Sequence, residues 1–139
     1  MSARSKARKR ALDALYAADI SRLDPAVLLS ETLSQVSDRQ NQQAIFDYAE
    51  TLVNGYRLNS QSIDSQLQGL SDGWKLERMP ALDRAILRIG AWEILFNDEV
   101  PAEVAISEAV ALAGEYSTDD SPKFVNGVLA RLAKSATAL

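Results

Sequence analysis

The chain has 139 residues, of which 47% are hydrophobic and 24% charged, so it can bury one sizeable core and is expected to form a single domain. It has no cysteine and no histidine, which excludes thiolate chemistry and disulfides and removes the commonest metal ligand and general base. Its apolar runs are too short to span a bilayer, and its basic start lacks the apolar segment of a signal peptide. We therefore expect a cytoplasmic protein without a membrane segment, and we find no site for a metal or cofactor.

The net charge of −4 is unevenly distributed. The first ten residues carry five basic side chains and no acid, whereas the rest of the chain is acidic. We call this segment the basic arm; its side chains are Arg4, Lys6, Arg8, Lys9 and Arg10. Such an arm on an acidic body favours binding to a phosphate backbone, and the alternative is a solvated tail.

Apolar residues recur at helical spacing along the chain, and we find no strand. The basic arm runs without a Gly or Pro into a first helix, which Leu12 and Leu15 continue. Asp24 followed by Pro25 is a capping residue with proline at the first helical position, so a second helix is expected over 25–36.

The middle of the chain predicts two more helices. Residues 45–56 repeat apolar side chains at positions i, i+4, i+7 and i+11, as an amphipathic helix does. A shorter helix holds Ile63 and Leu67 and closes at Gly69. The stretch 70–80, with Gly73 and Pro80, breaks the pattern, so we expect a subdomain boundary there.

The last third predicts three helices. Residues 80–96 are apolar around most of the helix, which indicates burial. Pro101 begins a sixth helix with an apolar stripe that reaches Tyr116, and Ser121 caps a seventh that Pro122 begins. The fold class is therefore all-α, with about seven helices.

The basic arm is unfavourable as a free helix end. Cations there face the positive end of the helix dipole and repel one another at i, i+3 and i+4, as Arg4 and Arg8 would. Stability does not explain them, but a negatively charged partner would. We expect the first turns to be frayed when free and helical when bound to nucleic acid.

The stretch "STDDSPKFVNGVLARL" (117–132) places a glycine in the second turn of a helix. Gly127 would let a neighbouring helix approach closely. The residues before it offer backbone N–H donors, the charge of Lys123 and the ring of Phe124, which suit a phosphate and an unstacked base. The alternative is that Phe124 and Val125 are core residues.

Some single residues also have two interpretations. Trp74 and Trp92 are expected in the core rather than as base-stacking platforms. Arg84 and Arg88, one turn apart, either pair with acids on a facing helix or belong to a partner surface. Glu93 must reach solvent or be paired, because an isolated buried carboxylate is costly.

Four segments resemble the transcription antitermination factor NusB family: "ARKRALDALYAADI", "RMPALDRAILRIGAWEIL", "VPAEVAISEAVALA" and "STDDSPKFVNGVLARL". The resemblance spans most of the chain, strongly from about 74 to 132. It implies two small packed helical bundles and a non-enzymatic protein that binds the boxA element of ribosomal RNA leaders. It also implies a heterodimer with the ribosomal protein NusE, and assembly with elongating RNA polymerase.

The resemblance also assigns residues. It implies RNA contacts for the basic arm, for Tyr16 in "ALY", and for the "DSxKFVNG" positions Asp120, Ser121, Lys123, Phe124 and Asn126. A region used for the ribosomal partner falls on Asp83 and its neighbours, to which we add Arg84 and Arg88. Two features depart from the family pattern: Pro122 removes a backbone donor, and the arm mixes lysine with arginine.

Two other functions are compatible with parts of the sequence. A similar helical domain precedes the catalytic domain of ribosomal RNA methyltransferases, but 139 residues leave no room for a domain that binds a methyl donor. A helical self-association module would make the basic arm incidental. The sequence also leaves a homodimer open.

Overall fold

The computed structural model describes residues 2–137. Over that range the chain forms seven α-helices and one 3-10 turn, with no strand, as expected for an all-α fold. The helices are α1 (Ala3–Ser21), α2 (Pro25–Gln35), α3 (Arg39–Leu58), α4 (Ser60–Leu70), α5 (Ala81–Phe96), α6 (Ala102–Tyr116) and α7 (Ser121–Thr137), and the turn η1 is Leu76–Arg78.

Local signals set the helix ends near the start of the chain. The Ser2 hydroxyl accepts a hydrogen bond from the Ser5 N–H and caps α1, and the Asp24 carboxylate accepts from the Ala26 N–H and caps α2. Arg22 ends α1 with a left-handed backbone (φ 62°) and donates its N–H to the Ala18 carbonyl. The arm is therefore a capped helical segment, and our expectation that it frays when free is not supported.

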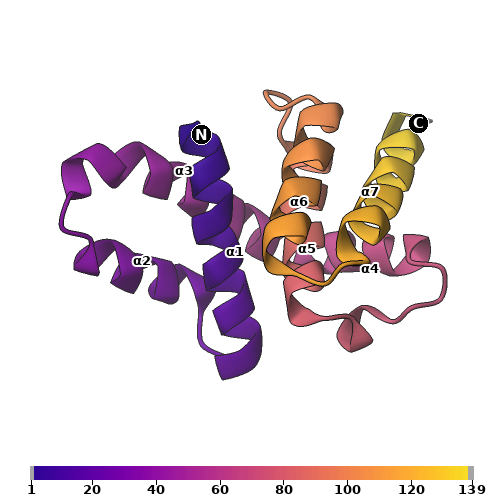
Figure 1. Cartoon of the computed structure of the whole chain (residues 1–139), viewed down its shortest axis with the longest axis horizontal. Helices are drawn as coiled ribbons and strands as arrows, with labels where there is room; N and C mark the ends of the chain where they lie inside the picture. The colour runs from indigo at the N-terminus through magenta and orange to yellow at the C-terminus, as the bar shows by residue number, and fades with distance from the viewer. Residues whose placement is uncertain (1, 138–139) are drawn as a thin grey trace.

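The helices form two groups (Figure 1). Helices α1, α2 and α3 pack together, α4 packs on α5 and α7, and α5, α6 and α7 pack on one another, while α5 also contacts α1 and α3. The change between groups comes at Asn59, ahead of the stretch 70–80 where we expected a boundary, because α4 packs with the C-terminal helices. One apolar cluster draws side chains from both groups. The organisation as a single domain stays a prediction.

Close helix approach occurs at two glycines, and Gly127 is not one of them. A Cβ on Gly55 would lie 2.2 Å from the Trp92 ring, and one on Gly90 would lie 2.6 Å from a Leu129 methyl group. A Cβ on Gly127 would meet only Arg131 of its own helix, at 3.4 Å. The prediction of a close helix contact at Gly127 is therefore wrong.

The two tryptophans differ. Trp92 is 9% exposed and lies in the core, as predicted, whereas Trp74 is 41% exposed, so its assignment to the core is wrong. Trp74 follows Gly73 in the connection between α4 and η1, where the chain runs over the surface. Within residues 2–137, no helix has the length and apolar character needed to cross a membrane.

Candidate nucleic-acid interface

Three cations of the basic arm line a groove between α1, α3 and the end of α6. Its lining includes Lys6, Lys9 and Arg10 of the arm, together with Asp13, Gln42, Ile45 and Tyr116. The Lys9 ammonium lies 2.6 Å from an Asp13 oxygen and 4.6 Å from the centre of the Tyr116 ring. The Arg10 guanidinium lies 5.1 Å from the centre of the Phe46 ring. Each ring attracts its cation without neutralising it, while Asp13 pairs with Lys9.

Arg8 has a different position from the rest of the arm. It is 3% exposed, and its Nε and Nη2 each lie 2.9 Å from an oxygen of Glu93, while Nη1 lies 3.3 Å from Glu108. Burial alone lowers the pKa of Arg8, but the hydrogen bonds and charge of Glu93 outweigh it, so the pKa is raised. Arg8 is thus a structural residue in this conformation, and its assignment as a phosphate contact is not supported.

Glu93 is paired rather than exposed, which confirms the requirement for a partner. The Tyr48 hydroxyl also donates a hydrogen bond to Glu93, and Asn97 donates to the Tyr48 oxygen at 3.1 Å. Burial raises the pKa of Tyr48, and the hydrogen bond to the negatively charged Glu93 raises it further. This Arg8 cluster ties the start of α1 to α3 and α5.

Ion pairs with acids on other elements stabilise part of the basic arm in the folded protein. This is contrary to our expectation that stability does not explain the charges of the arm. Arg4 Nη2 lies 2.9 Å from Glu99 in the connection between α5 and α6, and its guanidinium lies 5.0 Å from the centre of the Tyr48 ring. Over the described part of the arm, Arg8–Glu93 is thus a buried ion pair, and Arg4–Glu99 and Lys9–Asp13 are more exposed ones. Lys6, Lys9 and Arg10 are the arm cations that line this groove, and Arg4, whose side chain is 42% exposed, lies outside it.

Tyr116 is the residue of this groove that sequence reasoning missed. The sequence placed it on the apolar stripe of the sixth helix, and in the structure it is 38% exposed at the end of α6. Partial desolvation raises the pKa of Tyr116, as do a hydrogen bond and the charge of Glu115. Tyr16 is 36% exposed, and it lies seven residues after Lys9, so both side chains fall on the same side of α1.

The start of α7 is held by a buried hydrogen-bond cluster. Ser121 is 1% exposed and donates to an Asp83 oxygen at 2.9 Å, while the Thr118 N–H donates to the Ser121 hydroxyl at 3.2 Å. Ser117 donates to the other Asp83 oxygen. Helix α7 begins at Ser121 itself, and the Ser121 hydroxyl binds Asp83 of α5. Its predicted role as the cap that precedes α7 is therefore wrong.

The buried hydrogen bonds around Asp83 enclose two residues that were predicted as binding contacts. Asp83 is 2% exposed, so the structure does not support it as a partner contact, and Ser121 is equally closed to RNA. Asp120, Lys123 and Asn126 are exposed. The motif thus combines residues that fix α7 on α5 with residues that face solvent.

Phe124 lies between the two interpretations that the sequence allowed. It is half-buried and packs against the edge of the core. Its ring also meets the exposed Trp74 ring, with centres 4.9 Å apart and planes at 60°, an edge-to-face contact. Val125 beside it is fully buried, as the core interpretation required.

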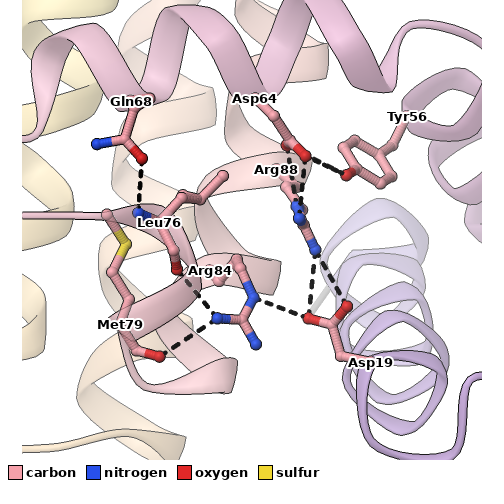
Figure 2. A network of polar contacts seen from close by, with 8 residues as sticks. All are labelled: Asp19, Tyr56, Asp64, Gln68, Leu76, Met79, Arg84 and Arg88. Carbon is pink, nitrogen blue, oxygen red and sulfur yellow. Dashed lines mark hydrogen bonds and ion pairs between the residues drawn. The ribbon is translucent and has the colours of Figure 1, made fainter.

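Arg84 and Arg88 pair with acids on facing helices, which was one of the two alternatives (Figure 2). Arg84 Nε lies 2.9 Å from Asp19 of α1, and its Nη1 donates to the carbonyls of Leu76 and Met79. Arg88 contacts Asp19 at 3.2 Å and, through two nitrogens, Asp64 of α4 at 3.0 Å.

The same cluster contains a tyrosine and leaves little arginine surface. The Tyr56 hydroxyl donates to Asp64 at 2.9 Å (Figure 2), and burial raises the pKa of Tyr56. The Arg84 and Arg88 side chains are only 15% and 13% exposed. We call this the Arg88 cluster; it joins the end of α1 to α3, α4 and α5, so neither arginine is free to act as a partner contact without breaking these pairs.

Comparisons with known proteins agree with the sequence resemblance. Residues 5–134 match the model of the NusB family. The chain is 51% identical over 135 residues to the transcription antitermination protein NusB of Leifsonia xyli, which covers 97% of this chain and 94% of that protein. It is 49% identical over its full length to NusB of Beutenbergia cavernae, of which it covers 94%.

Solved structures show the same fold. A NusB structure from T. maritima superposes with a TM-score of 0.84 at 32% identity, covering 98% of this chain and 97% of that one. A structure of antitermination factors NusB and NusE in complex with dsRNA gives a TM-score of 0.84 at 26% identity, covering 97% of this chain and 98% of that one. The sequence matches and the shared fold show that the chain belongs to the NusB family.

Proposed function

We propose that this protein is an RNA-binding transcription antitermination factor that binds boxA-type leader RNA together with NusE and joins the RNA polymerase antitermination complex. The related structure with NusE and dsRNA supports this assignment. In this role the protein works by binding rather than by catalysis, and it works in the cytoplasm, where transcripts emerge.

The observation that carries the proposal is the groove of the basic arm. Lys6, Lys9 and Arg10 lie on a helix that is already capped and held in place by the Arg8 cluster. Ordering a flexible basic tail on RNA would cost conformational entropy, whereas a formed helix avoids that cost. Tyr116 adds an aromatic ring beside the cations, and a ring beside positive charge suits a base next to its phosphate.

The test is titration of a boxA-type RNA, with and without NusE, at several salt concentrations. The variant Lys6→Ala/Lys9→Ala/Arg10→Ala should lower affinity at least tenfold. It should also reduce the slope of log K against log salt by about 2, since each phosphate contact on a single strand contributes roughly 0.7. Arg8 is left unchanged because it is structural.

Lys134→Ala, in the exposed last turn of α7, is the matched control for the single variant Lys6→Ala, because each change removes one exposed positive charge. It should leave both affinity and salt slope close to those of the parent. Equal losses in the control would show that only the net charge matters. An unchanged affinity in the triple variant would remove the arm groove from the RNA site.

A further inference from the structure

The connection between α4 and η1 presents an aromatic side chain to solvent. Trp74 is 41% exposed, and it follows two consecutive residues with positive φ angles, Asp72 at 53° and Gly73 at 78°. An exposed tryptophan forfeits much of the stabilisation that its burial would give, so its exposed face calls for an explanation other than packing.

The backbone around Trp74 is fixed on both sides. The Trp74 N–H donates to the Ser71 carbonyl at 3.0 Å. Gln68 of α4 donates to the Trp74 carbonyl at 3.2 Å and accepts from the Leu76 N–H at 2.8 Å, the contact drawn in Figure 2. One glutamine thus holds the chain before and after Lys75, and the Trp74 ring is presented from a rigid turn.

The Trp74 ring continues the surface of Phe124. The two rings meet edge to face with centres 4.9 Å apart, so an RNA strand that reaches Phe124 also lies within reach of Trp74. Each ring is next to an exposed lysine in the sequence, Lys75 and Lys123. Asp72, the nearest acid before Trp74, faces Arg131, whose Nη2 lies 3.5 Å from it. The local surface therefore combines two rings with two exposed cations.

We propose that Trp74 is a base-stacking residue that, with Phe124, forms a two-ring platform for an unpaired base of single-stranded RNA. The inference rests on the proposed function, and it adds a binding residue from a segment far from the "SPKFVNG" motif in sequence. Stacking on an aromatic ring tolerates any base, because every base has a π-face. The platform therefore contributes affinity for unpaired RNA rather than sequence preference.

The chain contains two tryptophans, so fluorescence tests the inference directly. Trp92 is buried beside Gly55, while Trp74 is exposed. Saturating single-stranded leader RNA should quench the tryptophan emission of the parent protein and protect it from acrylamide. A fully paired RNA of the same length should do neither. In Trp74→Phe the RNA-dependent change should disappear, since only Trp92 remains.

Affinity gives the second readout. Trp74→Ala should lower affinity for single-stranded RNA by about 5- to 150-fold, the range expected for one base–aromatic stack, and Trp74→Phe should restore most of it. Phe96→Ala removes another exposed ring, 45% exposed at the end of α5, and should leave affinity unchanged. A denaturant curve for each variant confirms that the protein is folded during the titration.

The outcomes separate this inference from the proposed function. If the parent binds leader RNA but its tryptophan emission does not change, or if folded Trp74→Ala binds as tightly as the parent, the platform is wrong and the arm groove stands. If the parent binds no leader RNA, both proposals fall. A quench that persists in Trp74→Phe would assign the signal to Trp92 and overturn the inference.

Discussion

Helix α1 is fixed at each end by an arginine, carboxylates and a tyrosine, but the two clusters differ in their access to water. At the start of α1, Arg8 and Glu93 are 3% and 1% exposed. At its end, Arg88 is 13% exposed, and its partners Asp19 and Asp64 are 25% and 32% exposed. The same kinds of side chain thus pair at both ends of α1. Water is excluded from the cluster at the start, which we call the dry cluster, and partly reaches the one at the end, the wet cluster.

The difference assigns the two clusters different consequences. Removing Arg8 from the dry pair leaves the buried Glu93 charge without water or a counter-ion, whereas water can reach the carboxylates of the wet cluster. The dry cluster is therefore expected to hold the basic arm with a strength that does not depend on salt. The wet cluster is expected to hold the end of α1 against α4 and α5 with a strength that depends on salt.

The largest expected effect comes from Arg8→Met. This change leaves the buried Glu93 with Tyr48 as its remaining partner, and it should lower the free energy of unfolding by about 3–5 kcal/mol. Chemical denaturation measures it. The double variant Arg8→Met/Glu93→Leu should recover much of the loss, because no buried charge remains. A loss below about 1 kcal/mol in Arg8→Met would contradict the dry setting.

The second prediction applies the same change to the wet cluster. Arg88→Met should lower the free energy of unfolding by only about 1–2 kcal/mol, because water solvates Asp19 and Asp64 once the guanidinium is gone. Raising the salt concentration to about 1 M should shrink this difference, since screening weakens exposed pairs. The Arg8→Met difference should stay. Equal costs and equal salt responses would remove the contrast between the two ends of α1.

Burial is what the sequence does not reveal here. The helices followed from apolar spacing and caps because those signals are local, and the pairing of Glu93 followed from its place on an apolar helix. Arg8 looked like its neighbours in the basic arm, because nothing in residues 1–10 indicates that Glu93 lies opposite, 85 positions later. Asp83 was misread for the same reason: its partners Ser117 and Ser121 come from another helix end.

The exposure of the aromatic side chains was even harder to predict from the sequence. Helical spacing placed Tyr116 on an apolar stripe, and apolar neighbours placed Trp74 in the core, yet both rings reach solvent. Periodicity gives the face of a helix but not where the neighbouring helix ends, so residues at the last turn are the least certain. Two positive φ angles in a row before Trp74 are a tertiary outcome that only Gly73 hinted at.

The third prediction uses alkaline pH to compare the two tyrosines. Burial raises the pKa of both Tyr48 and Tyr56 above the usual value of about 10, so the folded state keeps each proton after the unfolded state has lost it. Stability is then fully present below about pH 10 and falls above it, by up to about 1.4 kcal/mol per pH unit for each tyrosine.

Tyrosine variants separate these contributions. Tyr48→Phe and Tyr56→Phe should each flatten the fall in unfolding free energy above about pH 10, whereas Tyr16→Phe, which removes an exposed tyrosine, serves as the control. Absorbance of tyrosinate near 295 nm should show that Tyr48 and Tyr56 ionise together with unfolding. Ionisation of all four tyrosines in the folded protein would contradict the pKa directions.

The smallest effect on stability is expected at the most exposed pair. Arg4 and Glu99 are 42% and 76% exposed, so Glu99→Gln should lower the free energy of unfolding by less than about 0.5 kcal/mol.

The same variant should strengthen RNA binding. In the parent, Arg4 must exchange a carboxylate for a phosphate, and Glu99 repels the strand. Removing that charge should therefore raise affinity about two- to five-fold at low salt, with the gain fading as salt increases. Glu31→Gln, an equal charge change on the exposed side of α2, is the control and should leave affinity unchanged. If both variants raise affinity equally, the gain reflects net charge alone, and Glu99 does not compete with RNA for the arm.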